Sequence, residues 1–291
     1  MKMKKIAAID IGSNAMRLLI NNVIEYHGRK LFKKVGIVRV PIRLGTEAFT
    51  EQKISEYTRN RLLNALHAFK HLMEAQEVAM YRGCATSAMR EAENGADIIQ
   101  QIKEETGLKI EIINGKEEAA IIYGNHIEKL IDHKQAYLYV DVGGGSTEIT
   151  YFKNGTVADS RSFNIGTIRI LNDMVNTSKW EDLHAWLDDI LKGQHVQLIG
   201  SGGNINKVAK ISKKDPKEPL SYDYIKGYYN TLKSYTYEER ILKLDLNPDR
   251  ADVIIPAMKI FVNIMKWTKS KQIYVPKVGL ADGIIKQLAE V

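Results

Sequence analysis

Two short segments of this sequence place an aspartate at the end of an apolar run and follow it with small and hydroxyl-bearing residues. They are AAIDIGSN at Ala7–Asn14 and LYVDVGGGST at Leu138–Thr147. Glycine lets a phosphate approach backbone N–H groups closely, and the neighbouring hydroxyl and amide side chains add further donors. An ionised aspartate only accepts hydrogen bonds, so Asp10 and Asp141 suit Mg²⁺ or its bound waters. The pattern therefore predicts phosphate and metal binding.

A third glycine-bearing loop, Gly200–Gly203, follows another strand-like run. Any one of the three loops, taken alone, is better interpreted as a hairpin turn that needs small residues. Three such loops in one chain, two of them near-duplicates that carry aspartate, favour a phosphate-binding cleft between domains. Neither a P-loop nor a dinucleotide-binding fingerprint is present, because the sequence contains no Gly-Lys-Ser/Thr and no Gly-x-Gly-x-x-Gly.

The elements that must position these loops also occur twice. Each aspartate loop is followed by a second strand-like run and a hairpin signal, His-Gly at residues 27–28 and Asn-Gly at residues 154–155. Helical patterns then alternate with short strands. We therefore predict an α/β fold of two domains with mixed sheets flanked by helices, at residues 1–130 and 131–291. The last helix, at about residues 280–291, is predicted to pack back on the first domain.

The composition narrows the classes of partner. The chain of 291 residues has a formal net charge of +7, which favours anionic partners such as nucleic acid, acidic lipid or phosphate-rich small molecules. The basic residues are spread along the chain, without a basic tail or a basic stripe interleaved with aromatic residues. This distribution argues against a specific nucleic-acid partner.

Other features of the composition concern the cellular compartment. No apolar run reaches the roughly 18 residues of a membrane-spanning helix, and the opening MKMKKIAAID lacks the longer apolar stretch of a signal peptide. Cys84 is the only cysteine, so an intramolecular disulfide is excluded, which fits a reducing compartment. His67 and His71 are four residues apart, but no ligand cluster accompanies them. We therefore expect a cytoplasmic protein without a membrane partner or a zinc site.

Four segments of the chain resemble motifs of one known family. They are AIDIGSNAMRLLI, ATSAMREAENG, IINGKEEAAIIYGN and VDVGGGSTEIT, and they are similar to the exopolyphosphatase/guanosine pentaphosphate phosphohydrolase (Ppx/GppA) family of the actin–hsp70–sugar kinase superfamily. The later LIGSGGNINKVA and VPKVGLADGII occupy the expected order. The resemblance covers nearly the whole chain. It implies two RNase H-like (actin-like ATPase) domains facing an active-site cleft, in the short form that ends after the second domain.

The resemblance implies an activity and a catalytic residue. The family hydrolyses a terminal phosphoanhydride of inorganic polyphosphate, of pppGpp or of both, with Mg²⁺, and its members are often homodimers. The ligand expected here is accordingly polyphosphate or a guanosine penta- or tetraphosphate. In the family motif the second of two adjacent glutamates is the base, which assigns Glu118, while Glu117 supports the loop or caps the helix. Without the resemblance, the Glu-Glu pair reads as an ordinary helix start.

The resemblance assigns the other site residues as well. The carboxylates expected on the metal side are Asp10, Asp141 and Glu148. The residues expected to bind phosphate are Gly12, Ser13, Asn14, Arg17, Thr86, Ser87, Arg90, Gly143, Gly144, Gly145, Ser146, Thr147 and Gly202. A guanidinium such as that of Arg90 can clamp phosphate in bidentate fashion. The alternatives from strand and helix patterns are that Glu148 faces outward and that Arg90 is a solvated helix residue.

Three positions depart from the family pattern. Ala15 replaces the usual serine, Asn204 the usual threonine and Ala281 the usual arginine, although Lys277 can partly restore that charge. Losing cationic contacts matters most for long polyanions, so a short polyphosphate or a nucleotide phosphate is the expected substrate. Two other functions remain open. A non-catalytic sensor of polyphosphate or alarmone stays open because of the departures at Ala15 and Ala281. An ATP-dependent kinase of the same superfamily would use Gly200–Gly203 to line an adenosine pocket, although the Glu118 motif belongs to the hydrolases.

Overall fold

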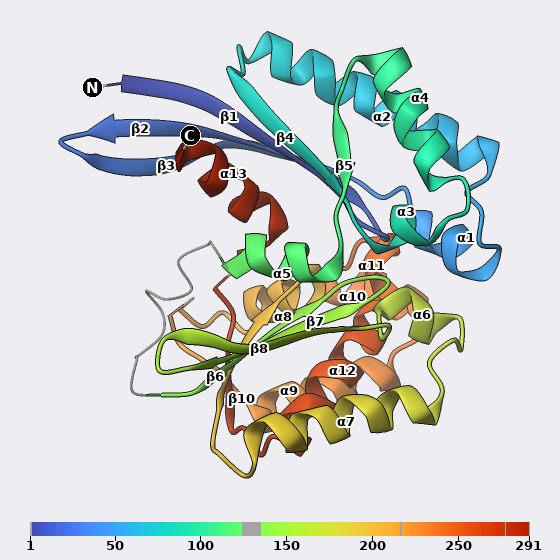
Figure 1. Ribbon diagram of the computed structural model, residues 1–291. Coiled ribbons are helices and arrows are strands. Elements are labelled where there is room, and N and C mark those ends of the chain that lie inside the picture. The colour runs from blue at the N-terminus through green and yellow to red at the C-terminus, as the bar shows by residue number, and fades with distance from the viewer. Residues whose placement is uncertain (1, 124–134, 216, 277, 291) are drawn as a thin grey trace. The chain divides into compact units, whose positions relative to one another are not determined.

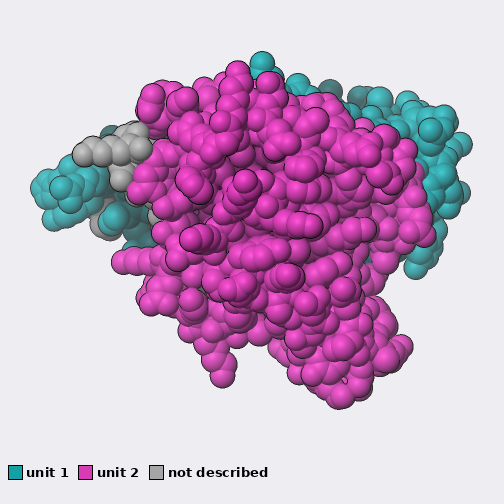
Figure 2. Space-filling model, turned by 90° about the horizontal axis from the view of Figure 1, so that it is seen from below, with its two compact units in different colours: residues 1–125, 278–291 teal, residues 126–277 magenta. Residues whose placement is uncertain are grey.

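The computed structural model describes residues 2–123, 135–215, 217–276 and 278–290. The chain forms two compact units, unit 1 with residues 1–125 and 278–291, and unit 2 with residues 126–277 (Figures 1 and 2). The predicted domain boundary at residue 130, and the charge expected from Lys277, lie outside the described residues.

Unit 1 is built on a five-stranded mixed sheet with the order β3-β2-β1-β4-β5. β1 (Lys2–Ile11), β2 (Met16–Tyr26) and β3 (Arg29–Val40) are antiparallel neighbours, whereas β4 (Met80–Ala85) and β5 (Ile110–Ile112) run parallel to β1. The second half of β1 is buried, and apart from Asp10 it is apolar, so the central strand places the first aspartate in a buried position near its carboxyl end.

Helices cover both faces of this sheet (Figure 1). The long α2 begins at the cap Ser55, whose side chain accepts the N–H of Thr58, and its apolar residues recur at helical spacing. α13 packs on β1 and on α5. The helices of unit 1 are α1 (Leu44–Thr50), α2 (Glu56–Ala75), α3 (Ser87–Glu91), α4 (Gly95–Thr106), α5 (Gly115–Tyr123) and α13 (Leu280–Glu290).

Unit 2 repeats this plan on a six-stranded mixed sheet with the order β10-β11-β9-β6-β7-β8. β6 lies between an antiparallel β7 and a parallel β9, as β1 lies between β2 and β4. The strands are β6 (Tyr137–Val142), β7 (Thr147–Lys153), β8 (Thr156–Phe163), β9 (Gln197–Ser201), β10 (Leu220–Ser221) and β11 (Gln272–Tyr274). The predicted α/β fold of two mixed sheets flanked by helices is confirmed.

The core of unit 2 lies between its sheet and a set of helices dominated by α12, which is apolar along most of its length. The helices are α6 (Thr167–Leu171), α7 (Thr177–Leu191), α8 (Gly203–Ile211), α9 (Tyr222–Ser234), α10 (Tyr237–Leu244), α11 (Pro248–Ala251) and α12 (Ile254–Trp267). Among the described residues, no helix combines the length and the apolarity that crossing a membrane requires.

The two predicted hairpins are both present. Residues 27–28 join β2 to β3, and residues 154–155 join β7 to β8. All four turn residues have positive φ, with 48° and 72° in the first turn and 55° and 75° in the second. This conformation matches the right-handed twist of the flanking strands and explains the glycine in each turn.

Candidate active site

The first loop (residues 10–15) and the second loop (residues 141–146) share one backbone geometry. In the first loop the N–H of Gly12 donates to the carbonyl of Ala15 at 3.2 Å, and the equivalent hydrogen bond of the second loop is 2.9 Å long. In both loops the carbonyl of the next residue accepts an N–H from the start of a later helix, at 2.8 Å from α1 and at 2.9 Å from α6. The duplication seen in the sequence is therefore a duplication of loop structure.

The second loop turns its carbonyl groups toward the segment of residues 165–169. The N–H of Thr167 donates to the carbonyl of Gly143 at 3.0 Å. The Nε of the buried Arg169 donates to the carbonyl of Gly145 at 2.7 Å. A buried guanidinium is retained only where its donors find acceptors, so this contact ties α6 to the loop.

Gly166 and Thr147 complete this packing. A Cβ on Gly166 would lie 2.3 Å from the carbonyl oxygen of Gly144, which leaves no room for a side chain. The hydroxyl of the fully buried Thr147 donates to the carbonyl of Ile165 at 2.5 Å. The hydroxyl that was expected to bind phosphate therefore helps to hold the loop in its conformation.

The remaining N–H groups of the second loop differ from that of Gly143 in having no acceptor among the described residues. Among the described residues, the N–H groups of Gly144, Gly145 and Ser146 donate to no protein acceptor. Successive N–H groups of this kind form a concavity that binds anions. This arrangement is suited to a phosphate oxygen.

The third loop lies beside the second within unit 2. Gly202 has a φ of 113°, and a Cβ there would lie 2.6 Å from the carbonyl oxygen of Val142 and 3.4 Å from the Oδ1 of Asp141. Nη1 of Arg250 also donates to the carbonyl of Gly203 at 3.0 Å. The glycine is therefore required both by its backbone conformation and by the close approach to the end of β6.

The strand that returns from each loop places a different side chain opposite the aspartate. Asp10 is paired in register with Arg17, and Asp141 is paired with Glu148. Directly opposed residues of antiparallel strands share a face with Cβ atoms about 5 Å apart. The first loop thus has a carboxylate opposite a guanidinium, with 3.5 Å between Asp10 Oδ2 and Arg17 Nη1. The second loop has two carboxylates opposite one another.

The acidic pair of the second loop fits a divalent cation. Glu148 is only 3% exposed and its Oε1 accepts the hydroxyl of Ser162 at 2.8 Å, so it does not point outward into solvent. Two like charges directly opposed across a sheet repel one another unless a cation neutralises them. Oxygen ligands are those that Mg²⁺ prefers, with several waters retained. The described residues contain no cluster of three or more His, Cys, Asp or Glu side chains placed to hold a metal.

Asp10 occupies a different environment. Burial raises the pKa of its carboxyl above the ordinary value, the charge of Arg17 opposes this, and the charge of Asp282 adds to it. The folded-state pKa of Asp10 lies above the unfolded value of 3.8. The free energy of unfolding therefore falls as the pH rises from the unfolded pKa through the folded pKa, and this loss of stability persists at neutral pH.

Replacing Asp10 by asparagine is therefore expected to stabilise the fold. At pH 7 in EDTA, Asp10→Asn should raise Tm by roughly 2–4 °C, which corresponds to about 1 kcal/mol in a protein of this size. Below pH 4 the difference should shrink, because the carboxyl of wild type is then protonated. Thermal melts of both proteins across pH provide the measurement, and a lower Tm for the variant at pH 7 would contradict it.

The other expected phosphate ligands of unit 1 are engaged with one another and with the backbone. The hydroxyls of Ser13 and Ser87, both buried, are 2.9 Å apart. Thr86 is also buried. Nη1 of Arg90 donates to the carbonyl of Ile113 at 2.7 Å, so its guanidinium lies against the segment that leads into α5 instead of pairing with helix neighbours.

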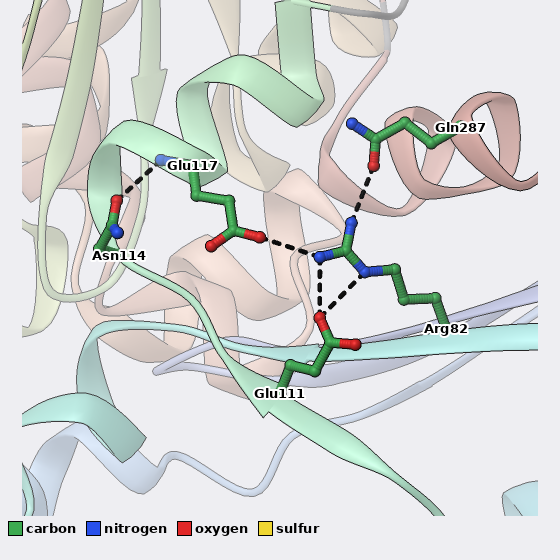
Figure 3. A network of polar contacts seen from close by, with 5 residues as sticks. All are labelled: Arg82, Glu111, Asn114, Glu117 and Gln287. Atoms are coloured by element: carbon green, nitrogen blue, oxygen red, sulfur yellow. Dashed lines mark hydrogen bonds and ion pairs between the residues drawn. The ribbon is translucent and has the colours of Figure 1, made fainter.

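The two adjacent glutamates lie in the first turn of α5 but differ in their surroundings. Asn114 caps the start of the helix, because its side chain accepts the N–H of Glu117 and its carbonyl accepts the N–H of Glu118, each at 2.9 Å. The Oε1 of Glu117 accepts Nη2 of Arg82 at 2.9 Å (Figure 3). Glu117 therefore supports the start of α5, and Glu118 is half-buried one position later.

Arg169, Gly166 and Arg82 are site-supporting residues that the sequence did not identify. A signal existed for Arg169, since it interrupts the otherwise apolar Ile168–Leu171 of a short helix. Two of the departures from the family pattern, Ala15 and Ala281, are buried, at 6% and 5% exposure.

Comparison with known proteins shows which family and which relatives the sequence resembles. The model of the Ppx/GppA phosphatase family matches residues 23–290. A bifunctional 3-dehydroquinate synthase/phosphatase of Fusobacterium nucleatum is 29% identical over 292 residues, which cover 90% of this chain but only 43% of that protein. A putative exopolyphosphatase of Haemophilus influenzae is 24% identical, with coverage of 98% of this chain and 91% of the relative. The chain thus spans less than half of the first relative and nearly all of the second.

Solved structures establish the fold. An exopolyphosphatase of Cytophaga hutchinsonii superposes with a TM-score of 0.85 at 22% identity, covering 99% of this chain and 98% of the other. The Ppx/GppA family member of Aquifex aeolicus gives a TM-score of 0.77 at 24% identity, with the same coverage. The chain therefore has the actin-like two-domain fold of these proteins.

Proposed function

Because the chain belongs to the Ppx/GppA phosphatase family, we propose that it is a Mg²⁺-dependent phosphohydrolase. Its substrate is inorganic polyphosphate, in short chains, or pppGpp, or both, and it releases the terminal phosphate. The observation that carries this proposal is the second loop, where three N–H groups without a protein acceptor lie at the turn between Asp141 and Glu148. The exopolyphosphatase name of the Haemophilus relative supports the choice of substrate.

Each unit has its own part in the proposed reaction. In unit 2, the N–H groups of Gly144, Gly145 and Ser146 bind phosphate oxygens, and Asp141 and Glu148 hold Mg²⁺. The metal neutralises the charge of the phosphate groups when it is bound. The buried Arg169, which donates to the carbonyl of Gly145, keeps the second loop in the conformation that binds phosphate.

In unit 1, the first loop with Arg17 binds phosphate as well, and Glu118 acts on water. Its carboxylate orients a water molecule and accepts one of its protons as the oxygen attacks the terminal phosphorus. The bond between that phosphorus and the bridging oxygen breaks, and the shortened chain leaves with the bridging oxygen. The products are inorganic phosphate and a substrate shorter by one phosphate.

The primary experiment measures phosphate release from tetraphosphate, long-chain polyphosphate and pppGpp, each with Mg²⁺ or EDTA. Mg²⁺-dependent release with the best kcat/KM on a short substrate supports the proposal. Tight binding without release indicates a sensor instead. Transfer of phosphate from ATP to an added acceptor, with no release from these substrates, indicates a kinase.

The metal role of Glu148 can be tested separately. Glu148→Gln is expected to raise the Mg²⁺ concentration for half-maximal phosphate release by more than about 100-fold, beyond the range typical of a lost outer-shell partner, because it removes the charge of a proposed ligand. The control is Ser162→Ala, which removes only the hydroxyl that Glu148 accepts and should have a smaller effect. A Mg²⁺ dependence of Glu148→Gln equal to that of wild type would exclude the residue as a metal ligand.

A further inference from the structure

Arg82 is the centre of a polar network within unit 1 (Figure 3). It lies on β4 and its side chain is 23% exposed. Its Nε and Nη2 donate to Oε2 of Glu111 on β5 at 3.1 and 2.8 Å. Nη2 also donates to Oε1 of Glu117 on α5 at 2.9 Å, and Nη1 donates to Oε1 of Gln287 on α13 at 2.9 Å. One guanidinium thus joins four elements.

The network acts on the helix that carries the proposed base. α5 has nine residues, too few for a helix that is stable without tertiary contacts. Its first turn is held by the Asn114 cap and by the contact between Glu117 and Arg82. Its second turn is held by α13, where a Cβ on Gly283 would lie 2.1 Å from the carbonyl oxygen of Ile121.

The chemistry of the guanidinium explains why an arginine occupies this position. Its donors are fixed in one plane, and three of its nitrogens reach three different acceptors here. A lysine ammonium is a point charge on a flexible stem and cannot hold the same fork. Because Glu111 of β5 holds the same guanidinium, the hydrogen bond to Glu117 restrains the position of the first turn of α5 relative to β4 and β5.

We propose that Arg82 is a positioning residue, which fixes α5 through Glu117 and, with Gln287 of α13, sets the place of Glu118. This inference rests on the proposed function, since it takes Glu118 to be the base. The alternative is that Arg82 only stabilises the pairing of β4 with β5 through Glu111. In a variant of unchanged stability, the positioning role predicts a lower kcat, whereas the purely stabilising role predicts an unchanged kcat.

The kinetic test uses Arg82→Lys alone and combined with Glu118→Gln, at enzyme concentrations that allow slow turnover to be followed. Arg82→Lys is expected to lower kcat for tetraphosphate by about tenfold, as displaced catalytic groups do, with KM changed by less than about twofold. In the Glu118→Gln background the same substitution should change the residual rate by less than about twofold, because both act on one group. Equal losses in the two backgrounds would overturn the proposal.

Two further measurements separate this inference from its premise. Arg161→Lys, which alters an exposed Arg–Asp pair in unit 2, is the matched control and should leave kcat unchanged. Amide hydrogen exchange in residues 115–123 should be faster in Arg82→Lys than in wild type, and unchanged exchange would overturn the proposal. If Glu118→Gln is as active as wild type, the assignment of Glu118 as the base fails, and if wild type releases no phosphate, the proposed function fails; in both cases the exchange measurement still decides whether Arg82 anchors α5.

Discussion

Glu118→Gln is expected to lower phosphate release from tetraphosphate by about 10²- to 10⁴-fold, the range typical of a lost general base. The amide keeps the size of the side chain but cannot accept a proton from water. Substrate binding should stay within about threefold of wild type, because the proposed phosphate contacts lie elsewhere. The two measurements are the rate of phosphate release at saturating tetraphosphate and the equilibrium binding of tetraphosphate to the protein.

The control for this substitution is Glu105→Gln on α4. Glu105 is exposed, and within the described part of the chain its carboxylate accepts only the side-chain amide of Gln101 one turn earlier, so loss of its charge should leave activity unchanged. A variant that binds tetraphosphate poorly but turns it over at the wild-type kcat would assign Glu118 to substrate binding instead of catalysis. Wild-type protein that binds but never releases phosphate would make the sensor the better description.

Gly166→Ala is expected to produce the second large effect. The φ of Gly166 is −130°, which alanine adopts readily, so the backbone conformation is no obstacle. The obstacle is space, because the new Cβ would lie 2.3 to 2.5 Å from backbone atoms of Gly144 and Gly145. Backbone atoms cannot rotate away as a side chain can, so the second loop must move.

The displacement should be visible in both activity and stability. Overpacking of this kind costs about 1–3 kcal/mol, and a shift of the loop N–H groups by about 1 Å costs on the order of 100-fold in rate. The control is Gly227→Ala in the middle of α9, where a Cβ meets nothing within 4 Å. That variant should be as active as wild type and slightly more stable, because alanine favours helix. Wild-type activity of Gly166→Ala would contradict the role of the second loop.

The sequence predicted what local residue types determine. The hairpins at residues 27–28 and 154–155 were predictable, since the turn itself requires positive φ and therefore glycine. The loop duplication was predictable because both segments place an aspartate before small and hydroxyl-bearing residues. Contacts between distant parts of the chain were not, and Arg82 reaches Gln287 across 205 positions. No periodicity in the sequence reports such a contact.

The residue opposite each of the two aspartates is determined by the register of the strand pairing, which the sequence analysis did not predict. Both were interpreted as metal ligands because each follows a strand and precedes small residues. The pairing of the returning strand then puts Arg17 opposite Asp10 and Glu148 opposite Asp141. The partners are seven positions apart in both halves, so the difference was present in the sequence, but only a known four-residue turn converts that spacing into a contact.

The position of α13 also has a consequence for the order of folding during synthesis. Unit 1 contains residues 278–290, whereas unit 2 is a continuous segment of the chain between α5 and α13. A ribosome that has completed α5 must add the whole of unit 2 before α13 emerges, which takes roughly 10–30 s at common elongation rates. During this interval Arg82 lacks the partner Gln287 and Ile121 lacks the close contact with Gly283. The sheet of unit 1 can therefore form before α5 has all of its contacts, and α5, with the proposed base Glu118, gains its contacts with α13 only after unit 2 has been made.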